Sequence, residues 1–205
     1  MSEYYTHPTA EVSTDARIGP GAKIWHQAQI REGAHLGANC IVGKGAYIDF
    51  GVQIGENCKL QNGAYVYHGS ILEDGVFLGP GVMLLNDKVP RAINTDGSLR
   101  TDDEWAVSAV FVGYGAAVGG GSVLTPGITV GRWALVGSGA VVTRNIPDYG
   151  IAYGNPARLV GYISPLSGER LDSPPEIPAG TLRCPTRTAA DRIAPAPHTA
   201  RGQAS

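Results

Sequence analysis

The chain has 205 residues, enough for one domain with a substantial hydrophobic core. Its formal net charge of −2 gives no excess of basic residues for binding nucleic acid or an anionic membrane surface, so neither partner is expected. No apolar run approaches the roughly 20 residues that span a bilayer, and the first residues lack a signal-peptide pattern, so we expect a cytoplasmic protein.

An aliphatic residue recurs every six positions from Val12 to Leu84, and from Ala16 onward a small or β-branched residue stands two positions before each. Residues two apart on a strand point to the same side, so each hexad directs one small and one larger apolar side chain inward. The 29 glycines, about twice the average share, fit a chain that turns after every short strand. Because six is far from a multiple of 3.6, the pattern excludes an amphipathic helix and predicts a β-solenoid of stacked parallel strands.

The period stops after Leu84, where the polar stretch "NDKVPR" begins, and it resumes with six further hexads from Val112 to Val142. We therefore predict an inserted loop over 85–109. Inserted loops on rigid solenoids often carry the functional residues.

The composition changes again after Ile163, because seven of the 14 prolines lie in 165–205. We expect one domain over 1–163 and a C-terminal extension over 164–205. Residues 164–185 are compatible with a short hairpin, and "APAPHTARGQAS" is typical of a disordered tail.

Over residues 8 to 162 the hexads resemble those of the hexapeptide-repeat acyltransferases. The resemblance implies a left-handed parallel β-helix in which three hexads, or 18 residues, form one coil. It also implies a homotrimer with active sites between subunits, and acetyl-CoA as the acyl donor.

With 18 residues in each coil, Asn86 falls on the same corner as His68, Phe50 and Glu32. His68 should then lie directly beneath Asn86, with the Asp87 carboxylate nearby, at the point where the loop leaves the solenoid. The alternative is that His68 is a solvated corner residue and the loop is a surface insertion without a function.

The stretch from Leu60 to Ala92, with "LEDGVF" and "NDKVPR", and the later "YGNPARLVGYIS" resemble one subgroup of this family. Members of the subgroup transfer an acetyl group from acetyl-CoA to the amine of a dTDP- or UDP-linked amino sugar, notably a 3-amino-3-deoxy hexose. Asp87 stands where related O-acetyltransferases have a histidine base. This difference favours an amine acceptor, because an amine on an electron-poor sugar ring is largely neutral and nucleophilic near pH 7.

The resemblance implies that the pair Asn86 and Asp87 holds the sugar. It places His68 where relatives have a glutamate, either orienting the sugar or accepting the amine proton. Further positions implied to bind the nucleotide sugar are Gln61, Tyr67, Lys88 and Arg91, the two basic residues as candidates for its pyrophosphate. Positions implied to border acetyl-CoA are Gly120, Ser138, Arg144 and Arg158. For each arginine the alternative is an exposed charge without a ligand.

Neither a metal site nor a covalent acyl-enzyme is expected. "VYHGS" supplies a lone histidine where a zinc site needs several, and no Ser/His/Asp arrangement is apparent. Cys40 and Cys58 occupy the small inward position of hexads that are one coil apart, so we interpret both as buried hydrophobes. Direct attack of the amine on the thioester is the predicted mechanism. The alternatives to an N-acetyltransferase are a sugar or antibiotic O-acetyltransferase and a non-catalytic solenoid scaffold.

Overall fold

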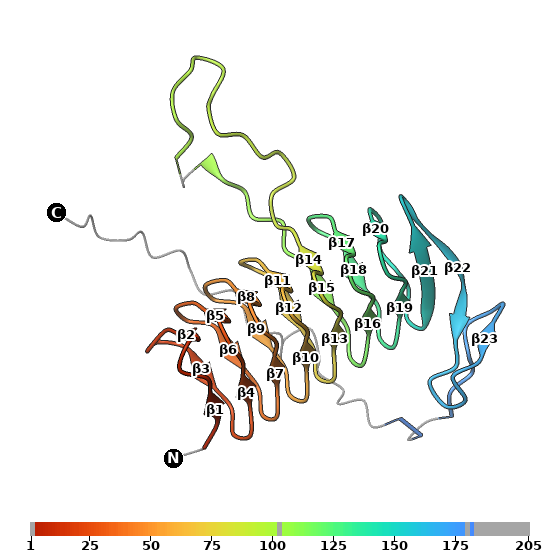
Figure 1. Ribbon diagram of the computed structural model, residues 1–205. Coiled ribbons are helices and arrows are strands. Elements are labelled where there is room, and N and C mark those ends of the chain that lie inside the picture. The colour runs from red at the N-terminus through yellow and green to blue at the C-terminus, as the bar shows by residue number, and fades with distance from the viewer. Residues whose placement is uncertain (1–2, 102–103, 179–180, 183–205) are drawn as a thin grey trace.

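The computed structural model describes residues 3–101, 104–178 and 181–182. Short strands stack into a three-sided prism, and a long loop projects from one of its edges between β14 and β15 (Figure 1). Cys184, His198 and the predicted disordered tail lie outside the described residues. No helix among these residues is long and apolar enough to cross a membrane.

Each side of the prism is one sheet whose solenoid strands run parallel. Sheet 1 contains β1 (Tyr5–Thr6), β4 (Lys23–Ile24), β7 (Ile41–Val42), β10 (Lys59–Leu60), β13 (Phe77–Leu78), β16 (Ala117–Val118), β19 (Leu135–Val136), β21 (Gly150–Gly154), β22 (Ala157–Ile163) and β23 (Arg170–Leu171). Sheet 2 contains β2 (Glu11–Val12), β5 (Gln29–Ile30), β8 (Tyr47–Ile48), β11 (Tyr65–Val66), β14 (Met83–Leu84), β17 (Val123–Leu124) and β20 (Val141–Val142). Sheet 3 contains β3 (Arg17–Ile18), β6 (His35–Leu36), β9 (Gln53–Ile54), β12 (Ile71–Leu72), β15 (Phe111–Val112) and β18 (Thr129–Val130).

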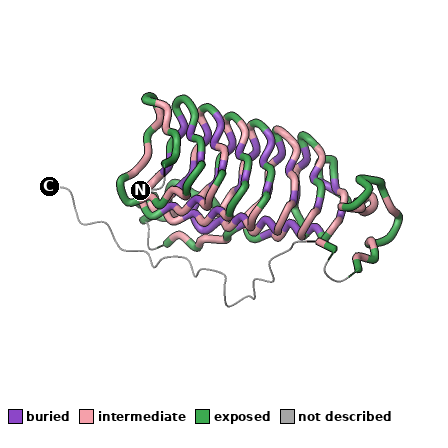
Figure 2. Tube along the Cα trace, turned by 90° about the horizontal axis from the view of Figure 1, so that it is seen from below, coloured by how far each residue is buried: buried purple, intermediate pink, exposed green. Residues whose placement is uncertain are grey.

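The register between neighbouring coils confirms the predicted period. Val66 pairs with Ile48 below it and with Leu84 above it, and these are the residues that the coil length read from the sequence assigns to it. Each of the nineteen predicted hexads has its own strand, from β2 to β20. The predicted β-helix of hexapeptide repeats is thereby confirmed, and its parallel sheets are consistent with the left-handed form. The hexad aliphatics from Ile24 to Val142 are at most 3% exposed, and buried residues recur from coil to coil (Figure 2).

The small inward positions are filled as predicted. Cys40 and Cys58 are both fully buried, and their thiols donate to the carbonyls of Gly55 at 3.1 Å and Glu73 at 3.2 Å. Hydrogen bonding with the Cys40 thiol, together with burial, raises the pKa of the Cys58 thiol. The complete burial of both side chains agrees with their interpretation as small hydrophobes of the core.

Two parts of the solenoid depart from the repeat read in the sequence. Thr6 stands one hexad before Val12 and forms β1, an additional strand that the pattern of aliphatic residues does not predict. At the other end Val136 pairs with Ala152, whereas an unbroken period would pair it with Gly154, so the last coil is shorter than the others. Beyond it β22 runs antiparallel to β21, and β23 pairs back onto β22.

Two glycines allow a test of what limits the stacking of the coils. A Cβ on Gly37 would lie 2.6 Å from the backbone nitrogen of Glu56 in the next coil, whereas Gly45, with φ of 63°, has open space around it. We expect Gly45→Ala to cost about 1–2 kcal/mol of unfolding free energy, the cost of a left-handed alanine. Gly37→Ala should cost about 3 kcal/mol or more, since backbone must move apart. Denaturant unfolding measures both, and equal losses would contradict this account of the stacking.

Candidate active site

The edge of the prism between sheets 2 and 3, here called the loop corner, carries the inserted loop. Its turns stack Glu32, Phe50, His68 and Asn86, one from each of four successive coils. Above them Ile71 pairs across the insertion with Phe111, so the loop lengthens a single coil without disturbing the stacking of the strands. The loop therefore departs directly above His68.

His68 is held rigidly in this corner. Its side chain is only 5% exposed, so the alternative of a solvated corner residue is wrong. The imidazole stacks on the Phe50 ring at 3.8 Å between centroids with 14° between the planes, and the Trp105 ring from the loop lies 6.1 Å away. Nδ1 lies 2.8 Å from the carbonyl oxygen of Phe50. A carbonyl only accepts, so Nδ1 carries a proton and Nε2 is the acceptor of the neutral ring.

Asn86 lies directly above His68, as the coil arithmetic predicts. Its side-chain amide donates to the carbonyl of His68 at 3.2 Å. The main chain of Asn86 also accepts a hydrogen bond from the Ser108 nitrogen at 2.8 Å, and Asp87 forms an antiparallel bridge with Val107. Asn86 and Asp87 therefore sit in the closed neck of the loop, where the backbone is fixed on both sides.

The remaining loop residues of interest point in different directions. The Asp87 carboxylate accepts from the Val89 nitrogen at 2.8 Å, which shapes the start of the loop. The Lys88 ammonium folds back onto the loop corner, 3.0 Å from where a Cβ on Gly127 would stand. Arg91 is exposed, and its guanidinium donates to the adjacent carbonyl of Pro90 at 3.1 Å.

Tyr67 belongs to an aromatic cluster on the outer side of sheet 2, immediately beside His68. Its ring lies 5.7 Å from that of Tyr47 and 6.5 Å from that of Tyr65, which it meets nearly in parallel. An aromatic surface therefore adjoins the loop corner.

Most of the other predicted positions lie away from the loop corner. Gln61, Gly120 and Ser138 all belong to the turns between sheets 1 and 2, so the width of sheet 2 separates them from His68. Gly120 and Ser138 occupy equivalent places in successive coils, and the carbonyl of Gly120 accepts from the Gly139 nitrogen at 2.9 Å. Arg144 follows β20 at the loop corner, whereas Arg158 is exposed in β22. Apart from Arg158, the predicted positions of one protomer are thus divided between two edges of the prism and the sheet that joins them.

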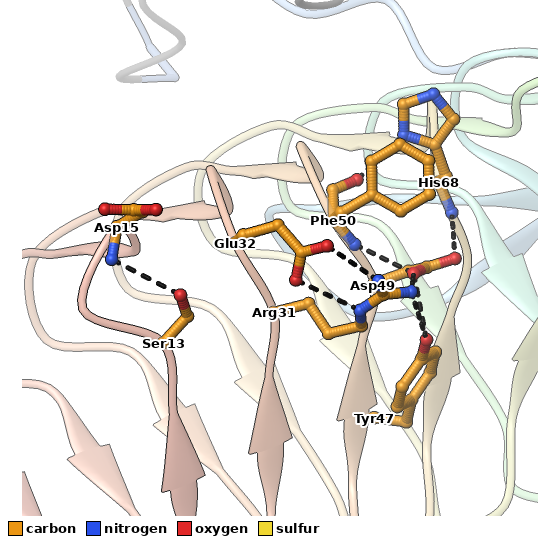
Figure 3. Close-up of polar contacts among 8 residues, drawn as sticks. All are labelled: Ser13, Asp15, Arg31, Glu32, Tyr47, Asp49, Phe50 and His68. Atoms are coloured by element: carbon orange, nitrogen blue, oxygen red, sulfur yellow. Dashed lines mark hydrogen bonds and ion pairs between the residues drawn. The ribbon is translucent and has the colours of Figure 1, made fainter. Parts of the chain in front are cut away.

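Sequence reasoning missed a charged network beneath His68. Asp49 is 6% exposed and lies one coil below Tyr67. Its Oδ1 accepts from Arg31 at 2.8 Å and from the Tyr47 hydroxyl at 2.8 Å, and its Oδ2 accepts from the main-chain nitrogen of His68 at 3.1 Å (Figure 3). Burial and the hydrogen bond to Asp49 raise the pKa of Tyr47, which stays protonated as a donor. The available signal was an arginine and an aspartate spaced by one coil on this corner.

The other described histidines are not part of this arrangement. His26 is exposed at the edge between sheets 1 and 2 and stacks on His7, with 3.5 Å between ring centroids. No cluster of three or more His, Cys, Asp or Glu side chains among the described residues could hold a metal ion. The groups gathered at the loop corner are a histidine, an amide, carboxylates and aromatic rings, a set suited to hydrogen bonding and proton transfer.

Two protein-family models match the sequence. One is described as the hexapeptide repeat of succinyl-transferase and matches residues 33–68 and 109–144. The other, bacterial transferase hexapeptide with six repeats, matches residues 15–49 and 51–86. Together they cover more than half of the chain.

A curated relative is the dTDP-3-amino-3,6-dideoxy-alpha-D-galactopyranose 3-N-acetyltransferase of Aneurinibacillus thermoaerophilus. It is 47% identical over 49 residues, which are 24% of this chain and 26% of the relative. The match therefore spans about a quarter of either protein.

Solved structures share the fold. The acetyltransferase domain of PglB from Neisseria gonorrhoeae, in complex with acetyl coenzyme A, is 24% identical with a TM-score of 0.50, and the alignment covers 77% of this chain and 57% of that one. A hexapeptide-repeat acetyltransferase from Vibrio cholerae, also with acetyl coenzyme A, is 19% identical with a TM-score of 0.51, covering 64% and 72% of the two chains.

Proposed function

This chain belongs to the hexapeptide-repeat transferases, and from that premise we propose that it transfers an acetyl group from acetyl-CoA to the amine of a dTDP- or UDP-linked amino sugar. The curated relative acts on a dTDP-linked 3-amino sugar, which supports a 3-amino-3-deoxy hexose as the acceptor. The observation that carries the proposal is His68, buried beneath Asn86 with Nδ1 donating to the Phe50 carbonyl.

The geometry favours His68 as the group that accepts the amine proton. Because Nδ1–H is committed to a carbonyl, the neutral imidazole has its lone pair on Nε2. Asn86 and Asp87, in the rigid neck of the loop, place the amine against the thioester, and such positioning supplies much of the rate enhancement.

The proposed reaction proceeds without an acyl-enzyme. The amine nitrogen attacks the thioester carbonyl carbon, and a backbone N–H stabilises the tetrahedral oxyanion. The C–N bond forms and the C–S bond breaks. The amine proton passes to Nε2 of His68, and the imidazolium returns it to the departing CoA thiolate, which leaves as the free thiol. The products are the N-acetyl sugar nucleotide and CoA.

We propose a homotrimer with active sites between subunits. Its support is the division of the predicted positions between two edges of one protomer. If the loop corner of one subunit faces the edge between sheets 1 and 2 of its neighbour, Gln61, Gly120 and Ser138 of that neighbour join His68. Lys88 and Arg91 would then meet the nucleotide pyrophosphate, and Arg144 and Arg158 the phosphates or adenine of CoA.

The test is release of free thiol from acetyl-CoA across a panel of amino-sugar nucleotides and their hydroxyl counterparts. We expect release with at least one amine and none above the acetyl-CoA blank with the matching hydroxyl. Release with hydroxyls alone would establish the O-acetyltransferase instead. A protein that binds neither CoA nor any nucleotide sugar would be a scaffold.

A further inference from the structure

Asp49 is the only buried carboxylate among the residues that the structure describes. Besides Arg31 and Tyr47 on Oδ1, it accepts hydrogen bonds from two main-chain nitrogens, those of Phe50 at 2.9 Å and His68 at 3.1 Å (Figure 3). Burying a charge is costly unless it is paired and hydrogen-bonded. Four donors satisfy that requirement here.

Equivalent positions in the other coils at this corner do not carry a carboxylate. The equivalent residues in the coils below and above Asp49 are Arg31 and Tyr67, and two coils below stands Ser13, whose hydroxyl accepts from the nearby Asp15 nitrogen at 3.3 Å. Arg31, for its part, is shared between Asp49 and Glu32, at 2.8 and 2.7 Å. The network is therefore specific to the coil beneath His68.

Asp49 holds two peptide groups that together determine the position and orientation of the His68 imidazole. One is the peptide nitrogen of His68 itself. The other is the nitrogen of Phe50, the residue whose carbonyl accepts Nδ1–H and whose ring stacks on the imidazole. From above, the Asn86 amide holds the carbonyl of His68. His68 is thus clamped between a carboxylate in the coil below and an amide in the coil above.

We propose that Asp49 is a positioning residue for His68: by holding the Phe50 and His68 backbones it keeps the imidazole in the tautomer with the proton on Nδ1 and the lone pair on Nε2. Arg31 and the Tyr47 hydroxyl hold the Asp49 carboxylate in place by donating hydrogen bonds to its Oδ1. The inference rests on the proposed function for the use of that lone pair, but the tautomer itself is a property of the resting protein.

The first test is nitrogen NMR of the full chain with labelled histidine, the His68 signals being assigned by their loss in His68→Ala. In the wild type we expect the neutral ring of His68 to be mainly the Nδ1–H tautomer. A wild-type His68 mainly in the Nε2–H tautomer would overturn the inference without any variant of Asp49.

The second test is Asp49→Asn. The substitution keeps the size of the side chain but replaces one carboxylate oxygen, an acceptor, with an NH2 group, a donor. All four partners of Asp49 are donors, so the new NH2 group loses its hydrogen bonds. We expect a mixture of His68 tautomers and a kcat about tenfold lower, with the KM for acetyl-CoA within about twofold of the wild type. The matched control is Asp74→Asn. Asp74 also accepts a main-chain hydrogen bond from the coil below, from Glu56 at 2.8 Å, but at the edge between sheets 3 and 1, away from all proposed site residues.

The outcomes separate this inference from the proposed function. If Asp49→Asn leaves both the tautomer and kcat like those of Asp74→Asn, Asp49 is not a positioning residue. If the wild type releases no thiol with any amine, the transferase proposal fails, and the tautomer measurement still decides the role of Asp49. Should Asp49→Asn fail to fold, the wild-type spectrum remains the deciding measurement.

Discussion

Replacing His68 with alanine is expected to lower kcat about 100-fold or more, the usual loss when a positioned general base is removed. The imidazole is buried, stacks on Phe50 and lies near Trp105, and its Nδ1 donates to a carbonyl. The other described histidines lie elsewhere on the solenoid, so none of them replaces its lone pair. Thiol release at saturating substrates measures the effect. His35→Ala, on the outer side of β6, is the matched control and should retain wild-type kcat.

A His68→Ala protein that assembles like the wild type and keeps kcat within fivefold would show that His68 is not the base. A rise in the KM for the sugar with little change in kcat would instead assign His68 to binding the amino sugar. The two roles implied by the resemblance are thereby separated by one kinetic comparison.

Asn86→Ala is expected to lower kcat/KM between about tenfold and 100-fold, because the change removes both a proposed sugar contact and the amide that holds the His68 carbonyl. Asp87→Ala should act in the same direction, and neither change should prevent assembly, since both side chains lie in the neck of the loop rather than in the core.

The matched control for Asn86 is Asn39→Gly. It removes an amide from the edge between sheets 3 and 1, and glycine readily adopts the φ of 59° that Asn39 has. Wild-type turnover in both Asn86→Ala and Asp87→Ala would remove this corner from the proposed active site.

The solenoid could be predicted from sequence because every hexad repeats the same pattern of one small and one larger apolar residue facing inward. One wrong residue in such a repeat changes little, so the core from Ile24 to Val142 followed from counting alone. The period did not predict the two ends of the solenoid. Thr6 is polar, so the aliphatic pattern gave no sign of β1. The last coil is shorter than 18 residues but still stacks on the coil before it, so Val136 pairs with Ala152.

The positions of site residues in the coils could be predicted from the period, whereas those of residues in the inserted loop could not. The coil spacing placed Asn86 over His68, and the hydrogen bond between them confirms the stacking. Trp105 lies in a segment without any period, so its approach to His68 had no signal in the sequence. The contact between Arg31 and Asp49 was not predicted, because the burial of a charged residue at a corner depends on its neighbours in other coils.

The same spacing separates the predicted binding residues. Gln61 precedes His68 by slightly more than one hexad and therefore lies on the neighbouring edge of the prism. In the proposed trimer, the edge between sheets 1 and 2 of one subunit faces the loop corner of its neighbour, so that residues of both edges act on one substrate. An assembly of subunits is thus part of the proposed mechanism rather than an addition to it.

The identity of the reaction product decides whether the protein transfers an acetyl group to a sugar amine. After incubation with acetyl-CoA and a dTDP- or UDP-linked 3-amino-3-deoxy hexose, mass spectrometry and proton NMR should show one acetyl group per sugar, bonded to nitrogen, with one free CoA thiol for each product formed. An acetyl group bonded to oxygen, or unchanged sugar nucleotides throughout the amine panel, would contradict the account.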